Sequence, residues 1–423
     1  MLDLATFAQE LTAGPSAQWR LLRVPVAPIS SLGLLANQQF WPRFYWQSRD
    51  RSHELAALGA AASAYSLEDA QQLLQQLPSA LAPLLVGGLA FDEQQPQWRG
   101  FPAVHLFVPQ LLWQRQGQQW QLLLAIAPAE AGQQQAAHCL AQLNRDDHLA
   151  HWPHLGLEQS TTPDQQQWQQ WVEQSLTNTQ LAKVVLARHS QVQLQQDANP
   201  WVLLNQWQQA EPDSSPFAIA FDAQRSFIGC SPERLFARQQ RQLASEALAG
   251  TIARAVDGSI SCRALTEDDK IQLENQLVAQ DIISRLAPLA DSWHVGSDEI
   301  RQQAAVAHLR RPIHAQLQAG VSDFALLRAL HPTPAVGGLP RAAALAHIRA
   351  TETSPRGWYA GAVGFVGHEQ SEMSVAIRSA LIEGAQLHLF AGVGLVQGSD
   401  ADSEWQELNH KLSTQLQILG LTP

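Results

Sequence analysis

The chain has few cysteines. Only Cys139, Cys230 and Cys262 occur among its 423 residues, and they lie far apart in the sequence. An odd number of cysteines at such spacing forms neither a disulfide framework nor a zinc site. We therefore expect small buried thiols in a reducing compartment, which is the usual state of a free cysteine.

Charged residues are also scarce, at 15% of the chain, and positive charge is the scarcer sign. The 27 lysines and arginines stand against 38 aspartates and glutamates, which leaves a formal net charge of −11. Binding to nucleic acid or to an anionic membrane needs clustered Lys and Arg. The composition therefore argues against both partners, and an anionic substrate would have to meet a few placed cations.

Long hydrophobic runs are missing. The most apolar stretch, residues 80–91, is broken by Pro83 and by Gly87 and Gly88, and it is shorter than the roughly 20 residues of a helical bilayer span. The N-terminus has no basic region of the kind that opens a secretory signal. We expect no membrane association and a cytoplasmic location.

A hydrophobic content of 45% over 423 residues predicts a globular protein of two to three domains, or one composite domain. Strand-like runs at 104–108 and 120–126 characterise the first part of the chain. Near residue 160, Thr162 can cap a helix. We place a boundary there, between an N-terminal subdomain (1–160) and a second domain (161–423).

Beyond this boundary, strands and helices are mixed without strict alternation, which predicts an α+β fold. The expected strands are 183–193, 218–221, 225–230 and a group within 357–396. One helix is expected to start near residue 162. The other expected helices cover 201–209, 266–286, 322–330 and 402–419.

Lys183 interrupts an apolar strand and shares a face with Val185 and Ala187. If that face is buried, desolvation would lower the pKa of the lysine and leave an amine that can act as a general base. The alternative is a lysine at the start of the strand whose side chain reaches solvent.

Glu233 follows an apolar strand and a Ser-Pro turn. In an apolar pocket the pKa of this carboxyl would rise, and it could deliver a proton to a leaving group. The alternative is an exposed carboxylate in a turn, paired with Arg234.

Two predicted helices carry carboxylates that could meet. Glu404, Glu407 and Lys411 share one face of the last predicted helix, and Glu274 lies on the predicted helix 266–286. One Glu from each helix, completed by waters and a ligand carboxylate, could hold Mg²⁺, a hard ion that takes few protein carboxylates. The alternative is a pair of solvated helix faces.

Small residues mark several loops. Gly250 permits a close backbone approach and Thr251 offers a hydroxyl, while Gly392 and Gly394 could turn backbone N–H groups toward an anion. His331 opens a rigid segment that is rich in proline and glycine. Each of these signals is weak alone.

Together these segments resemble the chorismate-utilising enzymes, a family of isochorismate synthases, salicylate synthases and the first components of anthranilate and aminodeoxychorismate synthases. The resemblance covers residues 160–419. Within the family, the chain is most similar to the isochorismate synthases of menaquinone biosynthesis. It is carried, in family order, by KVVLAR, FIGCSPERL, EALAGT, DDKIQLEN, HLRRPI, HPTPAVGG, GWYAGAVGF, SVAIRSALI, AGVGLVQGSD and EWQELNHK. It implies two packed, mainly antiparallel β-sheets surrounded by helices, with the N-terminal part completing the sandwich.

The resemblance also implies a reaction, the Mg²⁺-dependent and reversible isomerisation of chorismate to isochorismate by addition of water at C2 and loss of the C4 hydroxyl. Lys183 matches the residue that activates the water, and Glu233 matches the acid that protonates the departing hydroxyl. Glu274 and Glu407 match the Mg²⁺ ligands, with Glu404 as an accessory. The matching substrate-binding positions are Gly250, Thr251, His331, Tyr359, Arg378, Gly392, Gly394 and Lys411.

Two positions separate this chain from its ammonia-using relatives. Anthranilate synthases carry Gln where Lys183 stands, and water, unlike ammonia, needs a strong base. The usual aminodeoxychorismate synthases carry Lys where Ala249 stands. We therefore expect no glutaminase subunit. The resemblance also implies a monomer. The alternatives left open are a siderophore-pathway isochorismate synthase, a salicylate synthase, and an inactive chorismate-binding protein.

Overall fold

The computed structural model describes residues 5–12, 14–79, 84–151, 153, 155–253, 265, 267–303 and 305–422. Its strands are β1 Arg20–Pro25, β2 Arg43–Gln47, β3 His53–Ala64, β4 Leu84–Leu89, β5 Val104–Gln116, β6 Gln119–Ile126, β7 Gly156–Thr162, β8 Lys183–Leu194, β9 Ser215–Ala220, β10 Arg225–Ser231, β11 Arg234–Gln239, β12 Gln242–Ala253, β13 Ala290–Val295, β14 Glu299–Gln302, β15 Val306–Leu317, β16 Gly338–Leu339, β17 Ala362–Gly367, β18 Gln370–Val375, β19 Ser379–Glu383 and β20 Gln386–Leu395. Its helices are α1 Ala5–Thr12, α2 Ser31–Ala36, α3 Leu67–Gln76, α4 Ala129–Gln142, α5 Gln165–Thr177, α6 Pro200–Ala210, α8 Asp269–Leu286, η2 Ala287–Leu289, α9 Asp323–Leu330, α10 Arg341–Thr351 and α11 Ala401–Ile418.

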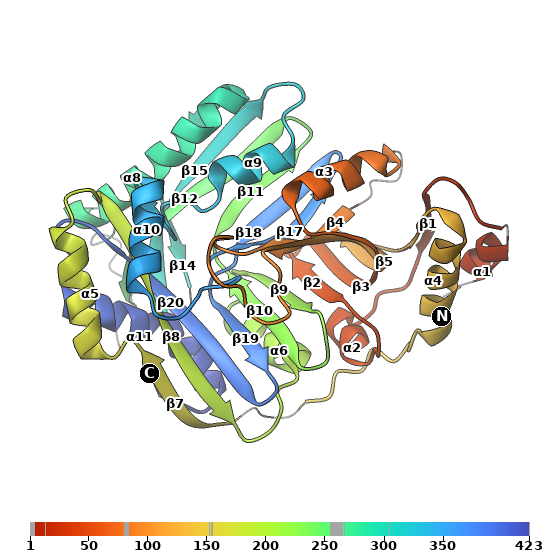
Figure 1. The fold of residues 1–423 in the computed structure, drawn as a ribbon, viewed down its shortest axis with the longest axis horizontal. Coiled ribbons are helices and arrows are strands. Elements are labelled where there is room, and N and C mark those ends of the chain that lie inside the picture. Colours follow the sequence, from red (N-terminus) through yellow and green to blue (C-terminus); the bar gives the residue numbers. More distant parts are fainter. Residues whose placement is uncertain are drawn as a thin grey trace.

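The strands form two antiparallel arms that share the long strand β5. One arm runs β1-β6-β5-β3-β2-β9-β10-β19-β20-β8-β7. The other runs β5-β4-β17-β18-β11-β12-β15, and both β13 and β14 pair with β15. Helices lie outside the strands (Figure 1). The predicted α+β class with mainly antiparallel sheets is confirmed.

One hydrophobic cluster spans both arms and includes tryptophans from distant parts of the chain. Trp46 of β2, Trp168 of α5 and Trp358 all have fully buried side chains. Burial of apolar surface at about 25 cal/mol per Å² makes such large side chains major contributors to the stability of the fold.

The N-terminal part of the chain is built into both arms. Strand β2 pairs with β9, and β4 pairs with β17, so residues before 160 lie between or beside strands from the second half. The division at residue 160 stays a prediction, but these pairings agree with the expected role of the N-terminal part in completing the sheets.

The predicted helix start at Thr162 is wrong. Thr162 is the last residue of β7, where it pairs with His189 of β8. Helix α5 begins only after Asp164, whose side chain accepts a hydrogen bond from Gln167 N at 2.8 Å. Asp caps a helix at least as well as Thr does, and the pairing of β7 with β8 decides which of the two residues is available.

Two further expectations concern cysteine and membrane segments. Cys139 and Cys230 are buried free thiols, as predicted, whereas Cys262 lies outside the described residues. Among the described residues, no helix has the length and apolar content that crossing a membrane requires.

Candidate active site

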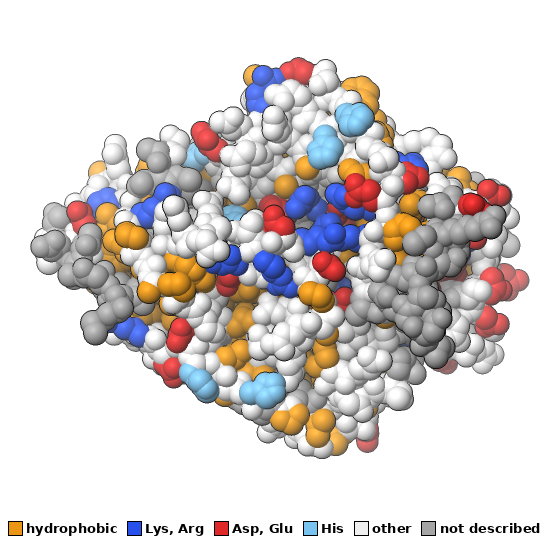
Figure 2. Space-filling model, turned by 180° about the vertical axis from the view of Figure 1, so that it is seen from behind, with side chains coloured by type: hydrophobic (Ala, Val, Ile, Leu, Met, Phe, Trp, Pro, Cys, Tyr) orange, Lys and Arg blue, Asp and Glu red, His pale blue; other side chains and the backbone are white. Residues whose placement is uncertain are grey.

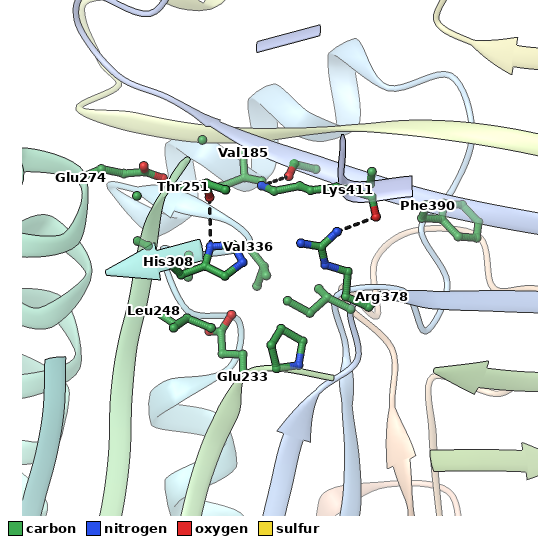
Figure 3. A pocket seen from close by; sticks show the side chains of 18 of the residues that line it. Val185, Glu233, Leu248, Thr251, Glu274, His308, Val336, Arg378, Phe390 and Lys411 are labelled. Atoms are coloured by element: carbon green, nitrogen blue, oxygen red, sulfur yellow. Dashed lines mark hydrogen bonds between the residues drawn. The ribbon is translucent and has the colours of Figure 1, made fainter. Parts of the chain in front are cut away.

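A single cavity collects side chains from many of these elements (Figure 3). Helix α8 packs against β12 and β15, and α11 packs against β20, which brings the two carboxylate-bearing helices to this place. The predicted residues that line the cavity are Glu233, Gly250, Thr251, Glu274, Tyr359, Arg378, Gly392, Gly394 and Lys411. The other lining residues are Val185, Pro232, Leu248, Ala249, His308, Ala335, Val336, Ile377, Phe390 and Ala391.

Lys183 lies beside the cavity in an ion pair with Glu274. Its side chain is fully buried, and its Nζ is 3.0 Å from Glu274 Oε1, so the alternative of a solvent-reaching lysine is wrong. Gly394 makes room for this pair, because a Cβ there would overlap Glu274 Oε1 and lie 2.8 Å from Lys183 Cε. Burial raises the pKa of Glu274, but the ammonium of Lys183, followed by Lys411 and Lys270, outweighs burial and leaves that pKa below its ordinary value.

Glu233 lies on the other side of the cavity from Glu274 and Lys411 (Figure 3). It is 3% exposed, and Thr333 Oγ1 donates to its carboxyl at 3.5 Å. Burial, with a further contribution from Glu246, raises the pKa of Glu233 to about 8. The alternative of an exposed turn carboxylate is wrong, because Arg234 pairs instead with Glu372, at 2.9 Å.

Glu246 is an anion that the sequence did not single out. Arg49 donates to its buried carboxylate, as do Arg310 Nε at 2.5 Å and the backbone N of Arg234 at 2.9 Å. Burial alone would raise the pKa of Glu246, but Arg49 and Arg310 lower it to about 2. The Glu246 carboxylate is therefore ionised, and it is bonded to the backbone N of Arg234, the residue that follows Glu233.

Two cations face the cavity from the side of α11. Arg378 adopts φ 51° and donates to Lys411 O and, at 3.1 Å, to Gln303 Oε1. Lys411 Nζ donates to Gly392 O at 2.8 Å and pairs with Glu407 Oε1 at 2.6 Å. A ligand carboxylate in the cavity would meet both positive charges.

His308 also lines the cavity, and sequence reasoning missed it. Thr251 Oγ1 lies 3.0 Å from its Nδ1, and Gln303 Oε1 lies 3.2 Å from its Nε2. Burial, then the charges of Arg378 and Lys411, places the pKa of His308 well below its ordinary value, so the ring is neutral. The residue opens the motif HLRRPI, which was the available signal.

The side chain of His331 does not reach the cavity. Its Nε2 lies 3.0 Å from Ala90 O and 3.2 Å from Phe91 O, and burial lowers its pKa to about 4. The neutral ring therefore anchors its segment to the N-terminal part of the chain. Two other residues of that segment, Ala335 and Val336, line the cavity in its place.

The carboxylates of α8 and α11 supply oxygen ligands of the kind that Mg²⁺ prefers. Glu404 is buried and pairs with Lys270, and burial followed by the charge of Glu407 raises its pKa. Glu274, Glu404 and Glu407 are each paired with a lysine, so a divalent cation bound here would compete with these ion pairs. Within the described ranges, no group of three or more His, Cys, Asp or Glu is arranged for a metal. Two carboxylates and waters can hold Mg²⁺. Glu274 lines the cavity, whereas Glu407 does not and is paired with Lys411, so the assignment of both as Mg²⁺ ligands stays a prediction.

With this geometry established, comparison with known proteins defines the class. A family model described as "Chorismate binding enzyme" matches residues 7–420, and the chain belongs to this family. It is 36% identical to "Isochorismate synthase MenF" of Escherichia coli (strain K12), over 98% of this chain and 97% of that protein. It is 32% identical to "Salicylate biosynthesis isochorismate synthase" of Pseudomonas aeruginosa, over 94% and 88%.

Solved structures agree with the sequence relatives. The structure of MenF, the menaquinone-specific isochorismate synthase from Escherichia coli, superposes with a TM-score of 0.90 at 33% identity and covers 98% of both chains. Anthranilate synthase component I from Streptococcus pneumoniae, with a TM-score of 0.65 at 18% identity over 93% and 92%, shares the fold. The predicted family is confirmed, and the prediction of an isochorismate synthase agrees with these relatives.

Proposed function

We propose that this chain is an isochorismate synthase of menaquinone biosynthesis that interconverts chorismate and isochorismate with Mg²⁺ as cofactor. The observation that carries the proposal is the placement of a buried lysine and a buried glutamate, whose pKa is raised to about 8, around one cavity that also faces Arg378 and Lys411. Relatives with matching length and fold bear this name.

The substrate is a dicarboxylate, and the cations of the cavity give it a place. Arg378 and Lys411 bind and orient its carboxylates, which a chain with a net charge of −11 would otherwise repel. Mg²⁺, held by Glu274 and Glu407 when bound, offsets further negative charge on the ligand and on the carboxylates.

The two buried groups, Lys183 and Glu233, then transfer protons at opposite ends of the substrate ring: one accepts a proton and the other donates one. Lys183, as a neutral amine, accepts a proton from a water as the water oxygen bonds to C2, and the double bonds shift. Glu233 donates its proton to the C4 hydroxyl, which leaves as water. One water enters and one leaves, so the reaction is an isomerisation. In reverse, the carboxylate of Glu233 and the ammonium of Lys183 exchange roles.

The same proposal covers partners and location. Because the nucleophile is water, the enzyme works without a glutaminase subunit, and we propose that it acts as a monomer in the cytoplasm. The buried free thiols of Cys139 and Cys230 are compatible with a reducing compartment.

The test is a product analysis of the purified full chain incubated with chorismate, with Mg²⁺ or with EDTA. The expected product is isochorismate, in an incomplete conversion that EDTA abolishes. Salicylate together with pyruvate would assign the protein to the salicylate synthases instead. No product in the presence of Mg²⁺, even with ammonia supplied, would make it an inactive chorismate-binding protein.

A further inference from the structure

A buried ion pair that the proposed mechanism does not use lies directly behind the cavity wall. The side chains of Arg356 and Glu352 are 1% and 4% exposed. Arg356 Nε donates to Glu352 Oε2 at 2.8 Å, and Arg356 Nη2 donates to the other oxygen, Oε1. Removing two charges from water is costly unless they are paired and hydrogen-bonded. The hydrogen bonds that this pair makes therefore indicate which parts of the structure it holds.

The pair fills an interruption in the sheet. On one edge, β8 pairs with β16 at residues 183 and 184 and with β7 from residue 189 onward. Between them, no described strand covers residues 185–188 on that edge. Arg356 Nη2 donates to Val185 O at 2.7 Å, and Ala187 N donates to Glu352 Oε1 at 2.8 Å. The ion pair therefore takes the hydrogen bonds that a neighbouring strand would make.

The guanidinium of Arg356 also binds a second segment that lines the cavity. Arg356 Nη1 donates to Val336 O at 2.8 Å, in the segment that follows His331. Its Cζ also lies 4.3 Å from the centre of the Phe91 ring and 5.9 Å from that of Tyr359. Val185, Val336 and Tyr359 all line the cavity. One side chain thus contacts three separate parts of its wall.

We propose that Arg356 and Glu352 are positioning residues that fix Lys183 and the adjoining cavity walls, an inference that rests on the proposed function. Lys183 lies two residues before Val185 on the same strand, so the position of its amine depends on the backbone that the ion pair holds. The planar fork of a guanidinium can bind two carbonyls and a carboxylate at once, whereas a lysine ammonium cannot reproduce that geometry.

The experiment compares two arginine-to-lysine variants of the full chain, Arg356→Lys and the matched control Arg238→Lys. Arg238 forms an equally buried, bidentate pair with Asp323, at 2.6 and 2.7 Å, and also donates to Gly367 O at 2.7 Å. Neither Arg238 nor its partners line the cavity. We expect Arg356→Lys to lower kcat by about 100-fold, the size of effect that a shift of about 1 Å in catalytic groups produces. KM should change much less, and Arg238→Lys should keep wild-type kcat.

Hydrogen exchange supplies a readout that does not depend on turnover. Amide protection of Ala187, whose N–H donates to Glu352, should fall in Arg356→Lys and stay unchanged in Arg238→Lys. Equal loss of kcat in both variants, or unchanged protection at Ala187, would overturn the proposal. Absence of isochorismate with the wild-type chain would instead reject the proposed function and leave the exchange result to judge the ion pair.

A second variant keeps the proposal testable if Arg356→Lys does not fold. The double variant Glu352→Gln/Arg356→Gln removes both charges together and leaves no unpaired buried charge. We expect it to fold, with low kcat and reduced protection on β8. Wild-type kcat in this folded double variant would refute the positioning role.

Discussion

Lys183 and Glu233 are both buried beside one cavity, yet each faces a carboxylate that acts on it differently. The amine of Lys183 has an opposite charge beside it, the carboxylate of Glu274. Burial raises the pKa of the Glu233 carboxyl, and the like charge of Glu246 raises it further, so Glu233 keeps its proton to a higher pH. Glu233 is thus a proton donor toward a ligand in the cavity, and Lys183 lies in an ion pair beside the same cavity.

Removing either group should abolish turnover without removing the binding site. For Lys183→Ala and Glu233→Gln we expect kcat to fall by about 100- to 10,000-fold, the range that general acid–base groups contribute. Mg²⁺-dependent binding of chorismate, measured by calorimetry, should persist because the cations stay in place. Glu299→Gln, which alters an exposed partner of Arg310, serves as the control. Wild-type-like turnover in either variant would sink the assignment.

The alkaline side of the pH profile should report Glu233. Its pKa is raised to about 8, so it carries a proton below that pH and loses it above, and kcat/KM should fall as the pH passes about 8. Glu246 helps to raise this pKa, while Lys183, Thr333 and Arg49 lower it.

The Glu246→Gln variant tests this origin. Removing the like charge lowers the pKa of Glu233, so the alkaline limb should move to lower pH. Arg49 and Arg310, left without their carboxylate, favour the ionised acid and push in the same direction. The Glu299→Gln profile should match that of the wild type, and an unmoved limb in Glu246→Gln would contradict the argument.

At this scale the sequence predicted the reacting residues but not their electrostatic neighbours. Lys183 and Glu233 stand in motifs that local pattern reveals. Arg49 and Glu246 are 197 residues apart, and no periodicity relates them. Long-range ion pairs of this kind form only when folding has brought the turn after β2, which carries Arg49, to Glu246 of β12.

Among the elements, strand β20 requires glycine at two positions, 392 and 394. Gly394 faces the Lys183–Glu274 pair, and Gly392 faces Tyr359, where a Cβ would lie 2.8 Å from the hydroxyl oxygen. Real Cβ atoms do not approach heavy atoms that closely, so any side chain at either position must displace a cavity residue.

Substitution of Gly394 by alanine should therefore disrupt the site and spare the fold. We expect Gly394→Ala to push Lys183 and Glu274 apart and to lower kcat by about 100-fold, and Mg²⁺ affinity should weaken as well. The control is Gly296→Ala, where the nearest atoms to the added Cβ would belong to the Pro312 side chain, at 3.3 Å or more. Near-normal activity in Gly394→Ala would show that the pair tolerates displacement.

Element boundaries were predicted less well than element types. The helices near 201–209 and 322–330 occur as α6 and α9, because apolar periodicity and caps such as Ser322 are local signals. The start of α5 was misplaced because the pairing of β7 with β8 is not local. His331 was assigned to the substrate for a similar reason, since its partners Ala90 and Phe91 lie more than 200 residues away.

Across the whole molecule, charge is unevenly distributed. The chain has a net charge of −11, yet Lys and Arg side chains gather near the middle of the face shown in Figure 2, with Asp and Glu among them. The expectation that a few placed cations meet an anionic substrate agrees with Arg378 and Lys411 in the cavity. The positions that the fold gives to charged side chains determine the local electrostatic potential more than the net charge of the chain does.

The two sheet arms depend on the N-terminal part of the chain. That part supplies β5, which the arms share, as well as β2 and β4, which pair with β9 and β17. It also supplies Arg49, which holds Glu246 near the proposed acid. The predicted catalytic domain, residues 161–423, would lack all four features.

We therefore expect residues 161–423 to be unable to fold alone. Without β2 and β4, strands β9 and β17 become uncovered edges that favour aggregation. The fragment should be insoluble or lack a cooperative thermal transition by circular dichroism. As a control, a protease site inserted after the exposed His151 can be cut once the full chain has folded. The two pieces should then stay associated and active, because the strand pairings and the Arg49–Glu246 ion pair need contact rather than covalent continuity. A fragment 161–423 that melts cooperatively near the temperature of the whole chain would show that the catalytic residues form an independent domain.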